Sequence, residues 1–210
     1  MEDKYILEYI RDILHGYQVK YLDITSARYH HNSSYDQATS IIKNGILSLE
    51  DQVKLKIAKY SKEDLKKLDN IEYHVNGSDG ISLAVVGLKD LLPNEMEYDP
   101  YQIDLVDFLI SSDTMAYRIT THYGNEFVTH ESIIHPSKIR TVDIRLLKYI
   151  DSLEKKDLTK EELMTIKNKF NALREIAIEI KRNNLNIPIR EMSYKEVVLD
   201  NEKLSKTYKL

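Results

Sequence analysis

Two strand-like runs that meet at a turn restrict the middle of this chain more than any other feature. Ala116–Thr121 and Glu126–Thr129 have the composition of strands, and Gly124-Asn125 stands between them as a turn signal. The stretch therefore predicts a hairpin with Glu126 just past its turn. A carboxylate at that place can be held rigidly and still face a cleft, although most charged strand residues are simply solvated.

The longest helix is predicted near the C-terminus. Apolar residues recur at helical spacing over Thr159–Asn183, and Glu162 stands three residues after Thr159, as in a capping box. With 210 residues, the chain is long enough for one domain with an appended helical part. We therefore divide it into a domain over residues 1–150 and a helical extension packed on that domain over residues 151–210.

Both short helices and strands are expected through the rest of the chain, and we expect an α+β fold. Two further helices are expected over Glu2–Leu14 and Ser34–Lys43, and Ser48–Lys67 is typical of two short helices broken near Tyr60-Ser61. Strands are expected at Val19–Ile24, Ala27–His31, Ile71–Val75, Ile81–Val86, Leu105–Ile110 and Ile139–Ile144.

His31 is expected between the end of a strand and the start of a helix. Ser33 or Ser34 can cap the first amides of that helix, and Asn44-Gly45 supplies its stop. The free amides and the dipole of a helix N-terminus favour anionic groups, so this is a natural place for a ligand. The alternative is an ordinary histidine beside a helix.

Composition excludes several classes of function. The chain has no cysteine, so it has no disulfide, no thiolate metal site and no cysteine nucleophile. A net charge of −4, with seven acids and no lysine or arginine in Asp90–Asp113, disfavours binding to long nucleic acids. The N-terminus is not a signal peptide and no apolar run reaches the length of a membrane span, so we expect a cytoplasmic protein without membrane contact.

A metal site is not expected. His30 and His31 are neighbours, but adjacent residues of a strand point to opposite faces and no third ligand is evident. The sequence also has no phosphate-binding loop, no GxGxxG, no HExxH and no nucleophile elbow, since Ser82 lacks the second glycine of that motif.

The order of the short motifs is more informative than any one of them. A strand ends in His31-x-Ser, a helix closes with Ile-Ile-Lys-Asn-Gly45-Ile-Leu, a Gly-Ile-Ser82-Leu strand follows, and Asn-Glu126 comes late, before Pro136-Ser-Lys-Ile139. This order resembles the ADP-ribosyltransferase superfamily, including its DNA-modifying toxins. The resemblance covers about residues 20–145 and rests on short motifs.

The resemblance implies a split, mixed β-sheet cleft that binds NAD in a bent conformation, with no metal. By the same resemblance, His31 is expected to hydrogen-bond a ribose hydroxyl of NAD, Ser33 makes a second polar contact, and Ser82 supports the glutamate. Glu126 binds the 2′-hydroxyl of the nicotinamide ribose and stabilises the positive charge that builds as nicotinamide leaves. Tyr123 or Tyr117 stacks on the cationic nicotinamide ring.

The chain also departs from the family pattern. Arg28, His30 and His31 compete for the first motif position, and the spacing to Gly45 favours His31. Gly124 stands where the arginine-directed subgroup has an acid or glutamine, which disfavours arginine as the acceptor. An RNA 2′-phosphotransferase of similar fold needs several basic residues for its phosphate, and only Arg28 and Arg118 offer themselves.

The first functional hypothesis is therefore a cytoplasmic NAD-dependent mono-ADP-ribosyltransferase, a glycosyltransferase that is toxin-like or regulatory. Its acceptor is a protein side chain, a nucleobase or a small molecule, and a toxin would have a neutralising partner protein. A second hypothesis is a catalytically silent nucleotide- or protein-binding module on the same scaffold. The third is a structural α+β protein without a site, in which replacing Glu126 changes stability by only about 0.5 kcal/mol.

Overall fold

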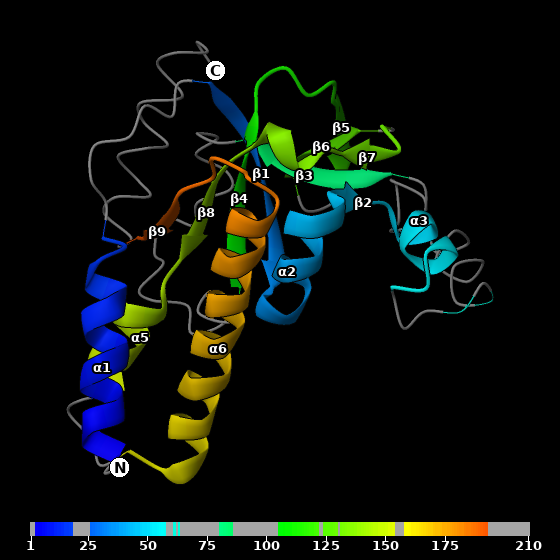
Figure 1. Cartoon of the computed structure of the whole chain (residues 1–210). Helices are drawn as coiled ribbons and strands as arrows, with labels where there is room; N and C mark the ends of the chain where they lie inside the picture. Colours follow the sequence, from blue (N-terminus) through cyan, green and yellow to red (C-terminus); the bar gives the residue numbers. More distant parts are fainter. Residues whose placement is uncertain are drawn as a thin grey trace.

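A computed structural model describes residues 3–18, 26–57, 61, 63, 80–85, 105–121, 124–129, 131–153 and 158–192. Within these ranges the fold is α+β, with a mixed sheet in the order β5-β6-β3-β1-β4-β8-β9 (Figure 1). Its strands are β1 (Ala27–Ser34), β3 (Ile81–Val85), β4 (Leu105–Ser111), β5 (Tyr117–Thr121), β6 (Gly124–Thr129), β8 (Ile139–Ile144) and β9 (Ile189–Glu191). Neighbouring strands are antiparallel except β8 and β9, which are parallel.

The described helices lie mainly on one side of this sheet. They are α1 (Asp3–His15), α2 (Tyr35–Asn44), α3 (Leu49–Lys54), α5 (Leu146–Leu153) and α6 (Lys160–Arg182), with a 3-10 turn η3 at Pro136–Lys138. In Figure 1, α2 and α6 lie side by side in front of β1 and β4, while α1 and α5 pack together at one end. None of the described helices is long and apolar enough to cross a membrane.

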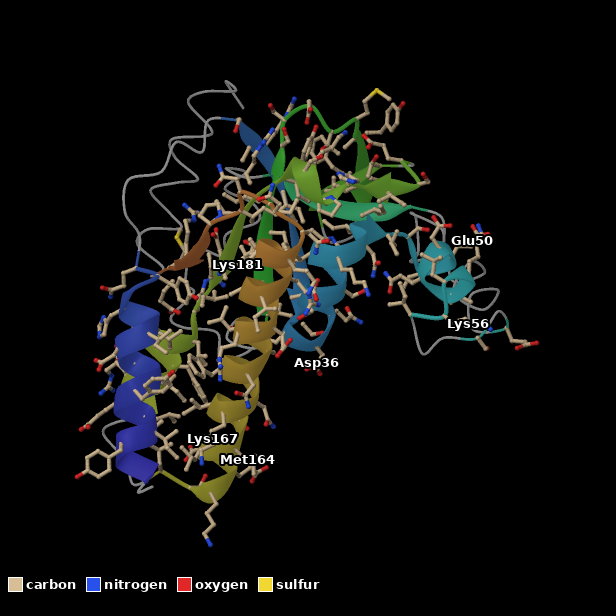
Figure 2. All side chains as sticks on the ribbon, in the orientation of Figure 1. Asp36, Glu50, Lys56, Met164, Lys167 and Lys181 are labelled. Carbon is tan, nitrogen blue, oxygen red and sulfur yellow. The ribbon has the colours of Figure 1, made fainter. Side chains whose placement is uncertain are left out.

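The hydrophobic core fills the space between the sheet and the layer of α2 and α6. Alternate residues of the central strands supply its sheet side, including Tyr29 and Phe108, and the helices contribute Ile42, Ile166 and Phe170. Exposed residues such as Asp36, Met164 and Lys181 mark the outer surface of the two helices (Figure 2). One core therefore joins the sheet to α6, whereas the division at residue 150 stays a prediction.

The predicted helices at the two ends of the described chain are confirmed. α1 covers the expected segment, and α6 begins and ends within one residue of Thr159–Asn183. The capping box forms as expected, because Thr159 Oγ1 accepts a hydrogen bond from the Glu162 amide at 3.2 Å. The Glu162 carboxylate accepts one from the Thr159 amide at 2.8 Å. The strands predicted at Ile81–Val86, Leu105–Ile110 and Ile139–Ile144 are also present.

Two local predictions are wrong. Gly124 and Asn125 already pair with Thr121 and Thr120, so they belong to β6 and not to the turn of the hairpin. β1 continues through His31 to Ser34, because β4 pairs with it along its whole length. His31 therefore lies inside a strand rather than at a helix N-terminus, and Ser34 is the N-cap residue of α2 without a side-chain hydrogen bond to the helix.

The sequence did not indicate a second, two-stranded sheet or helix α5. Strand β2 (Ile46–Leu47) pairs with β7 (Ile133–Ile134), which joins segments far apart in the chain. Gly45 makes this pairing possible, since its φ is +86° and a Cβ there would stand 2.6 Å from the Ile134 carbonyl oxygen. Several predicted segments fall outside the described residues: Val19–Ile24, Ile71–Val75, most of Asp90–Asp113 and the tail after Met192. Tyr60, at the break expected near Tyr60-Ser61, is also outside them. Helix α3 ends at Lys54.

Candidate functional site

The candidate site lies where β1 separates from β3. The two strands pair at Tyr29–Val85 and His30–Ala84, and the pairing ends there. In a regular ladder the next backbone groups of β1 would bind β3, but here the His31 side chain makes the next hydrogen bond between the two strands. Its Nδ1 lies 3.0 Å from the carbonyl oxygen of Ser82. The imidazole therefore bridges the two strands at the point where the sheet opens.

This hydrogen bond determines the chemical form of His31. A carbonyl oxygen only accepts, so Nδ1 carries the hydrogen and Nε2 presents a lone pair. Burial lowers the pKa of His31, and this outweighs the opposing effect of the bond to Ser82. The ring is thus neutral at pH 7. No residue in the described part of the chain bonds Nε2, which leaves it able to accept a hydrogen bond from a ligand hydroxyl.

A small pocket of about 60 Å³ opens beside His31, between β1, α2, β2 and the start of α3. Ser33 lines it two residues further along the same face of β1. The other polar lining residues are Gln37, Ser40 and Gln52, and Ser33 Oγ donates weakly to Gln37 Oε1 at 3.4 Å. The rest of the lining is apolar and comes from Ile41, Ile46, Leu47 and Ile57. The pocket thus has neutral donors and acceptors on part of its wall, and its volume suits a few water molecules or the hydroxyl-bearing edge of a sugar.

Ser82 and Glu126 come from the next two strands of the sheet. The Ser82 side chain is exposed, and its backbone pairs with Val128 of β6. The backbone of Glu126 lies two residues before Val128 and pairs with Ile119 of β5, but its side chain is outside the described part. Tyr123 is outside it entirely. Tyr117, the alternative stacking residue, begins β5 at the edge of the sheet and is 62% exposed.

His30 belongs to a different environment on the other face of β1. Its Nδ1 lies 3.1 Å from Oδ1 of Asp107, which comes from the adjacent strand β4. Burial is the largest influence on the pKa of His30 and lowers it, but the charge of Asp107 and the hydrogen bond to it together bring the pKa above its ordinary value. Burial raises the pKa of Asp107, but the charge of His30, the hydrogen bond to it and the charge of Arg145 together bring that pKa below its ordinary value. The sequence motifs did not indicate Asp107, although an isolated acid in the apolar run of β4 is a signal that could have found it.

The same face carries a buried ion pair that the sequence did not indicate. Asp143, the cross-strand partner of Asp107, accepts hydrogen bonds from Arg190 Nε at 2.7 Å and from Nη2 at 2.5 Å. The next residue, Glu191, accepts hydrogen bonds from the amides of Leu146 and Leu147 at the start of α5. These contacts hold β9 and α5 onto the sheet, which is a structural role.

Comparison of the sequence with models of known protein families finds no match, and comparison with curated proteins finds none either. Among the described residues, no group of three or more His, Cys, Asp or Glu side chains could hold a metal ion. The structure thus brings His31 and Ser33 to one pocket, whereas positions 82 and 126 belong to the other face of the sheet.

Proposed function

We propose that this chain is an NAD-dependent mono-ADP-ribosyltransferase whose cleft is the split between β1 and β3. The observation that carries the proposal is the neutral His31, which binds the Ser82 carbonyl at the opening of the sheet and shares a pocket with Ser33. A ring nitrogen with a lone pair beside a serine hydroxyl and two glutamine amides suits ribose hydroxyls. A binding place for ribose is what the first motif of the ADP-ribosyltransferase superfamily would provide.

By the register of β3 and β6, position 126 belongs to the face of the sheet opposite the pocket of His31 and Ser33, so NAD would have to pass through the split between β1 and β3 to meet both. Paired residues of an antiparallel ladder share a face, and residues two apart along a strand do so as well. Position 126 therefore shares a face with Val128 and with the exposed Ser82. The three motif residues His31, Ser82 and Glu126 come from three neighbouring strands, β1, β3 and β6.

In the proposed reaction, the bond between ribose C1′ and the nicotinamide nitrogen breaks while the acceptor forms a new bond to C1′. Positive charge builds on the ribose before the acceptor neutralises it. Glu126 binds the 2′-hydroxyl and stabilises that charge electrostatically, an effect worth several kcal/mol at a well-placed site, of the order of 3 kcal/mol. Tyr123 or Tyr117 stacks on the leaving nicotinamide. The acceptor is a protein side chain or a nucleobase, and a toxin-like member would have a neutralising partner protein.

The test is release of nicotinamide from NAD by the purified full chain, compared with Glu126→Gln. This substitution keeps the size and hydrogen-bonding ability of the side chain and removes its charge. Glu175→Gln on the exposed surface of α6 is the matched control. We expect wild type and the control to release nicotinamide. Glu126→Gln should bind NAD but release nicotinamide at least about 10²-fold more slowly. Equal rates for all three proteins would overturn the assignment of Glu126.

The second candidate is a catalytically silent binding module on the same scaffold. The pocket beside His31 has no charged residue among the described residues that line it, and recognition of a hydroxyl group needs none. The pocket could therefore serve binding without catalysis. This alternative predicts that wild type and Glu126→Gln bind NAD with the same affinity and that neither releases nicotinamide. If no protein binds NAD at millimolar concentration, the transferase and the nucleotide-binding form of the module both fail, and the protein-binding form remains.

A further inference from the structure

His30 has the geometry of a general base, and the role proposed so far does not use it. Asp107 receives the hydrogen on Nδ1, which fixes the ring orientation and leaves the lone pair on Nε2. The His30 side chain is 24% exposed and that of Asp107 is 17% exposed. No residue in the described ranges bonds His30 Nε2. A half-buried histidine oriented by a carboxylate, with its second nitrogen unoccupied, is the arrangement that proton transfer requires.

The strand register brings His30 into line with position 126. His30 pairs with Ala84 of β3, and Ser82, two residues from Ala84, pairs with Val128 of β6. One further step of the same ladder sets position 84 opposite position 126. His30 on β1 and position 126 on β6 are two strand spacings apart, with β3 between them. At roughly 4.8 Å per spacing, their backbones are about 10 Å apart. Both positions belong to the face of the sheet that also contains Ser82.

This separation is suited to a displacement at a sugar carbon. In inverting glycoside hydrolases, the two catalytic groups stand roughly 6.5–9.5 Å apart, because the nucleophile must fit between one group and the sugar. A base on β1 and a charge-stabilising carboxylate on β6 would leave a comparable space above β3. His31 is different, because it belongs to the opposite face and its Nδ1 is committed to Ser82.

We propose that His30, oriented by Asp107, is the general base that takes the proton from the nucleophile attacking C1′ of NAD. The nucleophile, water or an acceptor hydroxyl or amine, forms its bond to C1′ as the bond from C1′ to nicotinamide breaks. The electron pair of the broken bond neutralises the nicotinamide nitrogen, and the proton of the nucleophile moves to Nε2 of His30. Solvent then removes that proton. The inference rests on the proposed NAD-dependent transfer and adds the residue that activates the acceptor.

Other charged groups near His30 set the pH range in which its ring is neutral and can accept a proton. Asp107 of β4 and Asp143 of β8 raise its pKa, whereas Arg145, which follows β8, lowers it. The base form of His30 therefore becomes dominant only above the ordinary histidine pKa. Asp107→Asn removes the largest opposing charge and should lower the pKa of His30, while it keeps an oxygen that can accept the Nδ1 hydrogen.

The experiment is the pH profile of nicotinamide release by the full chain with saturating NAD and water as acceptor. Wild type is compared with His30→Gln and Asp107→Asn over roughly pH 5 to 9. We expect the wild-type rate to rise with pH through one ionisation and then level off. His30→Gln should lose about 10²-fold of the plateau rate and lose this ionisation, with little change in NAD affinity. Asp107→Asn should move the ionisation to lower pH.

The outcomes separate this inference from the proposed function. If His30→Gln releases nicotinamide with the wild-type profile, His30 is not the base, although the transferase assignment stands. If His30 only ties β1 to β4, His30→Gln would lower stability, or the rate at every pH, and would leave the ionisation in place. That result also overturns the inference. Asp107→Asn provides this readout if His30→Gln does not fold. Absence of turnover in wild type refutes the proposed function, and the inference falls with it.

Discussion

The environments on the two faces of β1 shift the pKa values of adjacent histidines in opposite directions. His31 belongs to the side of α2, beside a neutral pocket, and burial lowers its pKa. His30 belongs to the other side, where Asp107 outweighs burial and raises its pKa. The residue type, the strand and the backbone conformation are the same. The contrast teaches that strand alternation, by choosing the neighbours of each ring, decides whether a histidine serves as a neutral hydrogen-bonding group or as a group that exchanges protons near pH 7.

The charged face depends on the ion pair between Asp143 and Arg190. Both side chains are almost completely buried, so Asp143→Ala removes the carboxylate that compensates the charge of a buried guanidinium. We expect the free energy of unfolding to fall by about 3–5 kcal/mol, measured by urea denaturation. Asp151→Ala is the control, because Asp151 is 54% exposed and pairs with Arg11 at 3.3 Å. Its loss should cost at most about 1 kcal/mol, and equal losses for the two variants would show that the buried pair is not special.

The pocket side depends on the backbone at Gly45. A φ of +86° and the close approach of the Ile134 carbonyl leave no room for a Cβ. Gly45→Ala should therefore lower the free energy of unfolding by about 1–3 kcal/mol. Thermal or urea unfolding measures this loss. A change within about 0.5 kcal/mol, as at an ordinary surface position, would contradict the packing of β2 against β7 beside the pocket.

The two nitrogens of His31 can be tested separately. An asparagine amide reaches about as far as Nδ1, whereas a glutamine amide reaches about as far as Nε2. His31→Asn should keep the bond to the Ser82 carbonyl but lose about fivefold in NAD affinity, since one neutral hydrogen bond is worth about 1 kcal/mol. His31→Gln should show the reverse, with more of the affinity kept and stability reduced. Calorimetric titration with NAD measures the affinities, and identical behaviour of the two variants would exclude separate roles for the nitrogens.

The pH dependence of stability should distinguish the histidines by its sign. The pKa of His30 is raised above 6.5 in the folded chain, so its stabilisation is present below 6.5 and is lost as the pH rises through the folded pKa. The pKa of His31 is lowered, so its contribution is present above 6.5 and is lost as the pH falls through the folded pKa. From roughly pH 5 to 8, the stability penalty of His30→Gln should therefore shrink and that of His31→Gln should grow. Penalties that change in the same direction would contradict the two environments.

Helix α6 was predicted correctly because local patterns encode it, whereas the turn expected at Gly124-Asn125 was not. The capping box at Thr159 and Glu162 and the apolar stripe of α6 use neighbouring residues, so the sequence displays them directly. The pairing of β2 with β7 joins residues about 87 positions apart and depends on Gly45, whose own neighbourhood indicates only a helix stop. The end of β1 was misplaced for a similar reason, since pairing with β4 carries the strand past His31.

The candidate site was predictable only in part. The motif spacing identified His31 and Ser33, and both line the same pocket. The spacing gave no access to the hydrogen bond between His31 and Ser82, because that contact depends on where β1 leaves β3. The partner of His30 was equally hidden, since Asp107 lies 77 residues away and meets it only through the β1–β4 ladder. The roles of all five predicted site residues stay predictions: His31, Ser33, Ser82, Tyr123 and Glu126.

The most direct test of the account is an NMR titration of the full chain with NAD, which follows the imidazole resonances of His30 and His31. The account predicts that the His31 ring stays neutral, with the hydrogen on Nδ1, and that its Nε2 resonance shifts saturably as NAD binds. The His30 resonances should shift at the same NAD concentrations, because NAD that passes through the split between β1 and β3 would meet both faces of β1. If neither ring responds up to millimolar NAD, or if only residues remote from β1 respond, the split between β1 and β3 is not an NAD site.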